Sequence, residues 1–180
     1  GVELLLNGSP FSGKNFTWDL SFNFTRIRNK VNEIAPGVTS FNIPGNRFTG
    51  TVATIMVGKP YGVIVGTANP KDSAGNFIIN PASGTYGAGV ANQILADPNP
   101  NYTMGLNNNL KYKNFSLGFL FDYTDGGQFV SFSAGFSKSR GTLYETGIDR
   151  ESPRIIPGVI VDPATGKETP NNIQISAQTY

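Results

Sequence analysis

Strict alternation of apolar and polar residues between Phe16 and Arg26 is the feature that most constrains the fold of this chain. Successive side chains of an extended strand point to opposite faces, so a period of two predicts a β-strand. One face of this strand is aromatic or aliphatic, and the other is small and polar. The apolar positions are Phe16, Trp18, Leu20, Phe22 and Phe24.

The same alternation returns in two segments that a tight turn at Lys113-Asn114 joins into a hairpin. From Tyr102 to Tyr112 the even positions are apolar, with Asn108 as the exception, and from Phe115 to Tyr123 the odd positions are apolar. A tilted membrane-spanning β-strand needs about 9–11 residues, whereas strands of soluble proteins have roughly 5–6. The lengths of the segments therefore predict strands of a transmembrane barrel wall.

The predicted connections alternate between short and long. The turn from Tyr112 to Phe115 is very tight, and the stretch from Leu6 to Phe16 is a modest turn. The stretch from Ile27 to Asn101 has 75 residues, and the chain after Thr124 is irregular. Bacterial barrels combine short periplasmic turns with long extracellular loops, and compact soluble domains rarely carry loops this long.

The long connection has some predicted structure of its own. Thr51–Val57 and Tyr61–Val65 are expected to pair as an extra hairpin. Asn69-Pro70, Asp72–Asn76 and Asn80–Gly84 are expected to form turns. No segment of the chain has a convincing helical pattern.

Composition narrows the function classes. Charged residues make up 14% of the chain, against about 25% in a typical soluble domain. The absence of Cys and His excludes disulfides, thiolate or imidazole metal sites, and catalysis by a Cys or His base. The 14 basic and 12 acidic residues form neither a nucleic-acid footprint nor a distinctive carboxylate pair for glycoside hydrolysis. We expect a non-enzyme without cofactor or metal.

Three motifs are better explained by local structure than by chemistry. Gly8–Lys14 matches most of a phosphate-binding loop, but Asn15 replaces the required Ser or Thr and a strand follows in place of a helix. Asp122–Gly127 lacks the regular ligands of a calcium loop, so a turn is expected there. Five Asn-x-Ser/Thr sequons occur, but Asn23 lies inside a predicted strand, which favours chance over glycosylation.

Two fold hypotheses remain, since a soluble β-sandwich that serves as a glycan-binding or adhesin module would also alternate. Aromatic residues near the strand ends favour the barrel, where such rings form girdles at the membrane interfaces. The predicted lipid-facing and girdle residues are Phe16, Trp18, Phe22, Tyr102, Tyr112, Phe119 and Tyr123. The predicted lumen-lining residues are Asp19, Ser21, Asn23, Asn107, Asn109, Lys111 and Asp122.

The strand count predicts an incomplete barrel. Three or four long strands are present, and the smallest transmembrane barrels have about eight. Both ends of the chain look like cuts through a longer protein. We therefore expect residues 1–180 to be one partial all-β, antiparallel barrel domain.

Several strings, taken in order, resemble the SusC/RagA family of TonB-linked outer-membrane proteins of Bacteroidetes. They are Trp18–Val31, Gly58–Gly66, Asp97–Pro100, Gly105–Asn108, Lys113–Leu117, Asp122–Gly127, Pro157–Val159 and Asn172–Tyr180. Each string alone is weak, but their shared order covers nearly the whole chain.

This resemblance implies a segment from the later part of a 22-stranded TonB-dependent receptor barrel, without the plug domain and the remaining strands. It implies import of oligosaccharides or oligopeptides across the bacterial outer membrane. The implied partners are outer-membrane lipid, a SusD-like surface lipoprotein over the extracellular mouth, and TonB through regions outside this chain. The substrate itself is not implied.

Overall fold

A computed structural model describes residues 1–45, 50–177 and 179. The chain divides into two compact units. Unit 1 comprises Gly1–Pro44, Ala53–Ile64 and Ala96–Phe129, and unit 2 comprises Gly45–Val52, Val65–Leu95 and Val130–Tyr180. The described part is mostly antiparallel β-sheet with two short helices, in agreement with the all-β, antiparallel class that the sequence predicts.

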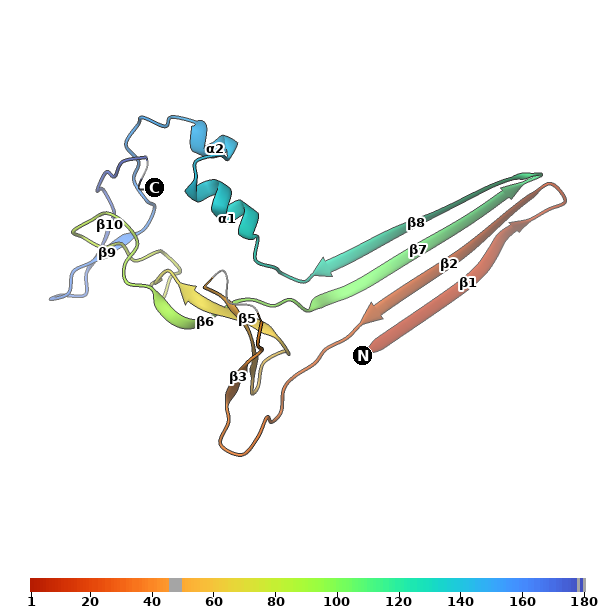
Figure 1. Cartoon of the computed structure of the whole chain (residues 1–180), viewed down its shortest axis with the longest axis horizontal. Coiled ribbons are helices and arrows are strands. Elements are labelled where there is room, and N and C mark those ends of the chain that lie inside the picture. The colour runs from red at the N-terminus through yellow and green to blue at the C-terminus, as the bar shows by residue number, and fades with distance from the viewer. Residues whose placement is uncertain (46–49, 178, 180) are drawn as a thin grey trace. The chain divides into compact units, whose positions relative to one another are not determined.

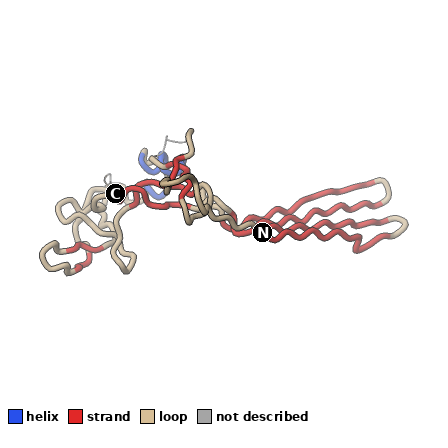
Figure 2. Tube along the Cα trace, turned by 90° about the horizontal axis from the view of Figure 1, so that it is seen from below, coloured by secondary structure: helices blue, strands red, loops and turns tan. Residues whose placement is uncertain are grey.

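Unit 1 contains a four-stranded antiparallel sheet in the order β1-β2-β7-β8. Its strands are β1 (Val2–Ser12), β2 (Phe16–Arg26), β7 (Pro100–Tyr112) and β8 (Phe115–Gly126), and Figure 2 shows them as one layer of extended chain. They have 11, 11, 13 and 12 residues. At about 3.3 Å per residue and a tilt of about 45°, 11 residues rise roughly 26 Å, close to the apolar band of an outer membrane.

The two tight turns of this sheet lie side by side at one end (Figure 1). Gly13 N donates to Phe16 O at 2.8 Å in the first turn, and Lys113 N of the second donates to Asn15 O of the first at 2.9 Å. Lys113 adopts a positive φ of 52°, which confirms the predicted turn at Lys113-Asn114. The long connections leave the sheet from its other end, so the predicted asymmetry of short and long connections is present.

Two predicted boundaries of the sheet are wrong. The turn expected between Leu6 and Phe16 is much shorter, because β1 continues through Ser12. Its register shifts between Gly8 and Phe11. Pro10 has no backbone N–H to donate, and it is tolerated here because residues at a bulge of an outer strand do not all pair with the neighbouring strand. The turn expected at Asp122–Gly127 is also absent, because β8 remains paired as far as Gly126.

A second sheet has the order β3-β4-β5-β6. Its strands are β3 (Ser40–Asn42), β4 (Val52–Met56), β5 (Val63–Ala68) and β6 (Val90–Ala96). Because β4 and β5 are neighbours, the extra hairpin predicted in the long connection is confirmed, although β5 begins and ends later than expected. The predicted turns at Asp72 and Asn80 are confirmed too, since each side-chain oxygen accepts from a backbone N–H two residues further on.

Unit 2 has a small apolar core formed by Ile79, Ile156 and Ile175, with Phe77 and Ile160 packed against it. Its last strands, β9 (Val159–Val161) and β10 (Glu168–Pro170), form an antiparallel hairpin. Ile79 N donates to Val159 O, and Val159 N donates to Phe77 O, both at 2.8 Å. Segments far apart in the sequence are therefore joined by backbone hydrogen bonds around these side chains.

Unit 2 also contains helices α1 (Phe132–Ser139) and α2 (Tyr144–Gly147), so the expectation that no segment is helical is wrong. Ser131 caps α1 by accepting from Ala134 N at 3.3 Å. Phe132 and Phe136 lie one turn apart with ring centroids 4.3 Å from each other, which is the i, i+4 contact of a helix. Among the described residues, no helix has both the length and the apolarity to cross a membrane.

Candidate functional site

The register of the four-stranded sheet gathers most polar positions of its strands on one face, with Leu5 and Leu120 as apolar exceptions. Asn23 lies opposite Gly105, which lies opposite Asp122 on β8. The polar face is defined by these side chains and those in register with them: Glu3, Leu5, Asn7, Asp19, Ser21, Asn23, Thr25, Thr103, Gly105, Asn107, Asn109, Lys111, Ser116, Gly118, Leu120, Asp122 and Thr124. All seven predicted lumen-lining residues share this face, and their contact with the lumen of a barrel stays a prediction.

A shallow depression of about 410 Å³ lies on the polar face beside the bulge of β1. It brings together three of the predicted residues, Asp19, Ser21 and Asn109, while the other four lie elsewhere on the face. Ser9 Oγ donates to Asp19 Oδ1 at 2.5 Å. Sequence reasoning missed the contribution of Ser9 because Asn7–Pro10 has the composition of a turn. The apolar run Leu4–Leu6 before it could have indicated a strand, because β1 continues from this run through Ser12.

Glycine leaves room for amide side chains on this face. A Cβ at Gly105 would lie 2.6 Å from Asn23 Nδ2, and one at Gly118 would lie 3.0 Å from Asn109 Oδ1. The two amides therefore lie across the neighbouring strand, where their donors and acceptors are available to a polar solute or to water. This arrangement can hydrogen-bond a passing solute, but it supplies no nucleophile with a paired base.

The opposite face is apolar and largely uncovered. The apolar face is formed by Leu4, Leu6, Phe11, Phe16, Trp18, Leu20, Phe22, Phe24, Tyr102, Met104, Leu106, Asn108, Leu110, Tyr112, Phe115, Leu117, Phe119, Phe121 and Tyr123. Phe121 is 64% exposed and Phe115 is 79% exposed. Because these large side chains are exposed, no second layer formed by the described residues covers this face. All seven predicted lipid-facing residues belong to it, and their contact with lipid remains a prediction.

A polar residue in the middle of the apolar face, Asn108, is satisfied within the sheet. Asn108 is only 4% exposed. Its Oδ1 accepts from Trp18 Nε1 at 3.2 Å, and its Nδ2 donates to Leu106 O at 3.3 Å. A buried amide without a hydrogen-bond partner costs roughly 1–3 kcal/mol. The hydrogen bond from the Trp18 indole avoids this cost for Asn108.

Aromatic side chains gather at both ends of the apolar face. At the end of the long connections, Tyr102 stacks on Phe24 with ring centroids 5.7 Å apart and lies 6.0 Å from Tyr123. At the turn end, the rings of Phe11 and Phe16 lie 5.4 Å apart. The paired ends match the placement of aromatic girdles at two membrane interfaces.

Side-chain amides hold the two ends of the long connection together in unit 1. Asn29 Nδ2 donates to Asn99 Oδ1 at 3.0 Å, and Asn29 Oδ1 accepts from Tyr61 N at 2.6 Å. Asn99 Nδ2 lies 2.9 Å from Tyr61 O and 2.7 Å from Asp97 Oδ1. We call Asn29, Tyr61, Asp97 and Asn99 the asparagine clasp. It fixes the points where the long connection leaves and rejoins the sheet.

Two aspartates hold turns in unit 2. Hydrogen bonds from the Asn76 side chain and from the backbone N–H groups of residues 74–76 lower the pKa of Asp72 below its ordinary value of 3.8. The bond from Ala164 N, followed by those from Thr165, lowers the pKa of Asp162 in the same way. The carboxylates thus act locally on backbone donors. The described residues contain no group of three or more His, Cys, Asp or Glu that could hold a metal ion.

These features define a mainly antiparallel β protein whose principal sheet has one polar and one uncovered apolar face. No protein-family model matches the chain. It is 26% identical to TonB-dependent receptor P3 of Formosa agariphila over 153 residues, covering 74% of this chain and 15% of that protein. It is 27% identical to TonB-dependent receptor SusC of Bacteroides thetaiotaomicron over 130 residues, covering 66% of this chain and 13% of that protein.

The two matches confirm the resemblance that the ordered strings indicated: the chain is similar to a segment of TonB-dependent receptors such as SusC. It spans about one seventh of the length of the curated relatives that it matches. Both relatives are named as receptors and neither as an enzyme, which agrees with the expectation of a non-enzyme.

Proposed function

We propose that this chain forms part of the barrel wall of an outer-membrane TonB-dependent importer. The observation that carries the proposal is the four-stranded sheet, whose strands have membrane-spanning length and whose apolar face is uncovered. Lipid is the medium that would cover such a face, because a soluble sandwich would bury it beneath a second sheet.

The polar face would line the water-filled interior of the barrel. Its amides, hydroxyls and few charges are the groups that a wet lumen accepts. Asp19, Ser21, Asn23, Asn107, Asn109, Lys111 and Asp122 are the candidates for contact with solutes. The outer strands β1 and β8 would pair with further strands of a closed barrel, because lipid offers no partner to edge N–H and C=O groups.

In this proposal the cargo is an oligosaccharide or an oligopeptide, and energy reaches the receptor through a TonB contact outside this segment. The segment belongs to the later part of a 22-stranded barrel, with the plug domain elsewhere in the protein. A SusD-like surface lipoprotein covers the extracellular mouth. The names of the two relatives support the TonB-dependent class, and the likeness to SusC supports the lipoprotein partner.

This chain contains no cysteine, so a label can be placed at one chosen position of it once any cysteine outside the chain has been replaced. Single cysteines along β8 of the full-length protein, labelled with an environment-sensitive fluorophore in lipid vesicles, should alternate in their environment. Labels at Leu117, Phe119 and Phe121 should be quenched by lipid-attached quenchers. Labels at Ser116, Gly118 and Asp122 should be quenched by water-soluble quenchers.

Leu120 makes the test sharper, because it is an apolar residue on the polar face. A label at this position should report water, although residue type alone would assign it to lipid. A uniform response along β8 would contradict the proposal. A protein that folds in buffer with the labels at Leu117 and Phe121 shielded from both quenchers would favour the soluble sandwich.

A further inference from the structure

The end of the four-stranded sheet that carries the two tight turns is basic, and we call it the turn end. The turn between β1 and β2 contains Lys14, and the turn between β7 and β8 contains Lys113. Neither residues 9–18 nor residues 110–121 include an Asp or a Glu. Each lysine is therefore the nearest charge to an apolar strand end, with no carboxylate close to it along the chain.

The acidic residues that flank these segments leave the turn end basic. Asp19 lies on the polar face, where its carboxylate accepts a hydrogen bond from Ser9 Oγ. Asp122 belongs to the same face and lies further from the turn. At the opposite end of the sheet, Glu3 and Arg26 carry charges of both signs. The two ends of the sheet therefore differ in charge.

The two lysines belong to turns that are hydrogen-bonded to each other. Lys113 N donates to Asn15 O at 2.9 Å, and Asn15 directly follows Lys14 in the chain. Figure 1 shows the two turns side by side at the end of the sheet. Both lysines are exposed. Two solvent-accessible cations are thus placed on neighbouring turns, at the same level of the sheet.

Lys113 lies beside the aromatic side chains of the apolar face. Its Nζ lies 5.4 Å from the centroid of the Tyr112 ring, within the range of a cation–π contact. Tyr112 pairs with Phe115 across the hairpin, and both side chains are exposed on the apolar face. Tyrosine rings and the long stems of lysines are typical of the headgroup level of a membrane. The Lys113 ammonium therefore lies at the border of the apolar face.

The conformation of the second turn does not itself require a lysine. Lys113 has a φ of 52°, in the left-handed region that favours Gly, Asn and Asp. An asparagine at this position would suit the backbone better, as it would at many hairpin turns. The turn alone therefore does not explain why a cation is present at residue 113.

We propose that the turn end binds the headgroups of anionic phospholipids, with Lys14 and Lys113 as the cations that contact the phosphate. This inference rests on the proposed barrel wall, because a sheet whose apolar face contacts acyl chains places these lysines at headgroup level. Short turns of bacterial barrels are periplasmic, so the lipids are those of the periplasmic leaflet. Lysine is a compact charge on a flexible stem, so it selects the negative charge of a lipid and not one headgroup structure.

Quenching by brominated lipids tests this inference in the full-length protein. A single fluorophore at Leu117, on the apolar face of β8, reports on lipid near the turn end. In phosphatidylcholine vesicles with a small fraction of brominated lipid, brominated phosphatidylglycerol should quench this label more strongly than brominated phosphatidylcholine. The relative affinity should favour phosphatidylglycerol by at least about fivefold, the effect of one lysine near an anionic surface. This preference should fall as salt rises.

Charge variants assign the preference to the two lysines. Lys14→Gln and Lys113→Gln should each lower it several-fold, and the double variant should abolish it. Lys113→Arg keeps the charge and should keep the preference. Lys71→Gln is the matched control, because Lys71 Nζ also lies over an aromatic ring, 4.6 Å from the centroid of Phe77, but belongs to unit 2. It should leave the preference unchanged.

A label at Tyr123, near the opposite end of the apolar face, separates a local effect from a general one. Its quenching should not change in Lys113→Gln, whereas that of the Leu117 label should. Equal changes at both labels would show a disturbed sheet and would overturn the assignment to the turn end.

Three further results would each overturn the inference: equal quenching by the two brominated lipids, a preference that survives in the double variant, and an equal loss in Lys71→Gln. Full reversal of the preference by a soluble hexaglutamate peptide would favour an acidic protein as the partner and would overturn it too. Any of these results with intact alternation along β8 would leave the proposed function standing. Absent alternation along β8 would overturn the proposed function, and the inference with it.

Discussion

Ile79 in unit 2 is 1% exposed, whereas Phe121 in the four-stranded sheet of unit 1 is 64% exposed. The first side chain is buried by its own unit, among Ile156 and Ile175. The second is held in place by a backbone ladder that runs the length of β7 and β8, and nothing in the described residues covers it. The two regions are therefore ordered by different interactions.

The comparison shows what has to cover the apolar side chains of each region. Nine large side chains of the apolar face, at Leu4, Leu6, Phe11, Tyr112, Phe115, Leu117, Phe119, Phe121 and Tyr123, are between 38% and 79% exposed. Covering them would contribute on the order of 10 kcal/mol, at about 1.5–3 kcal/mol for each full side chain. In the proposed receptor, contact with lipid supplies this stabilising free energy. The smaller core of unit 2 is covered by residues of unit 2 itself.

The largest effect is expected in the core of unit 2. Ile79→Ala should destabilise this unit by about 2–5 kcal/mol, because it removes a side chain buried on all sides. Hydrogen exchange should accelerate in peptides that contain Ile79 and Val159, which are joined by a backbone hydrogen bond. Ile79→Val, the conservative control, should cost roughly 0.5–1.5 kcal/mol. Equal exchange in all three proteins would show that the core does not hold unit 2 together.

Adjacent substitutions on β2 test the apolar face. If the proposed barrel assignment is right, Phe22→Lys places a charge on the lipid side near the bilayer midplane and should destabilise the inserted protein by roughly 2–4 kcal/mol. Asn23→Lys, one residue further on, should be tolerated because it lies on the polar face in register with Asp122. Equilibrium unfolding by urea in lipid vesicles measures both. Equal destabilisation would remove the distinction between the two faces.

A smaller effect is expected for the pair formed by Trp18 and Asn108. Trp18→Phe leaves the Asn108 amide without its indole donor and should cost more than the same change in an Asn108→Leu background. A double-mutant cycle should give a coupling of about 1 kcal/mol. If the two substitutions are additive, the indole does not compensate for the polar residue on the apolar face.

The smallest effect concerns the pH dependence of unit 2. The pKa of Asp72 is lowered below 3.8 by its hydrogen bonds with Asn76, Ala74 and Gly75. The carboxylate therefore stabilises the folded unit above pH 3.8 and loses this contribution as pH falls through its lowered pKa. Amide exchange at Ala74 and Asn76, followed between about pH 5 and pH 2, should reveal this loss.

Asp72→Ala is the control for that measurement. The variant should be less protected at pH 5 than the parent protein, and the acid-dependent change at Ala74 and Asn76 should be smaller. The Asp162 turn should respond to acid in both proteins, because its own bonds from Ala164 and Thr165 are intact. An unchanged acid response at residues 74–76 in Asp72→Ala would contradict the assignment.

The sequence predicted the four-stranded sheet of unit 1 better than the structure of unit 2, because a strand pattern can be recognised locally. Alternation at period two is local, so β2 was placed with its observed bounds, Phe16 and Arg26. The end of β1 was missed because Asn7–Pro10 has turn-forming residues, and pairing with β2 overrides that preference. Helix α1 was missed although Phe132 and Phe136 have helical spacing, because the short segment contains Gly and several Ser residues.

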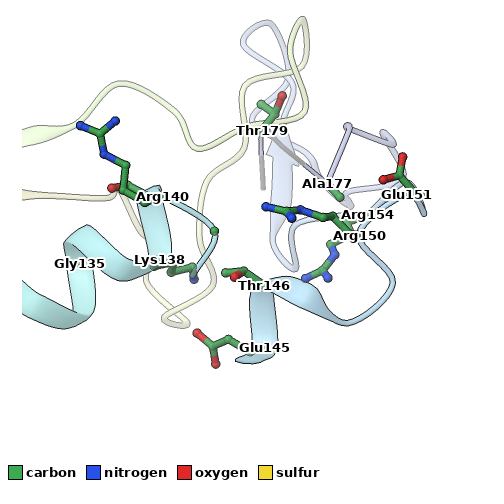
Figure 3. A pocket seen from close by; sticks show the side chains of 12 residues that line it. Gly135, Lys138, Arg140, Glu145, Thr146, Arg150, Glu151, Arg154, Ala177 and Thr179 are labelled. Atoms are coloured by element: carbon green, nitrogen blue, oxygen red, sulfur yellow. The ribbon is translucent and has the colours of Figure 1, made fainter. Parts of the chain in front are cut away.

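The seven lumen candidates could be grouped from the sequence because one face of a strand is readable locally. The cavity of unit 2 that Lys138, Arg150 and Arg154 line (Figure 3) could not be found in this way. Lys138, Arg150 and Arg154 are brought together by the path of the chain around the unit 2 core, which depends on pairing between Arg154 and Ile175. Such contacts between distant segments leave no periodic signal.

The asparagine clasp has a consequence for how such a protein can diversify. Asn29 and Asn99 are 70 residues apart in the sequence and meet through one amide hydrogen bond. Once the two ends of a stretch are held together, doubling its length adds only about 0.6 kcal/mol of closure entropy. Insertions and deletions between these two asparagines can therefore accumulate with little penalty to the strands below. In the proposed importer, the residues between the two asparagines could change during evolution while the four-stranded sheet stays the same.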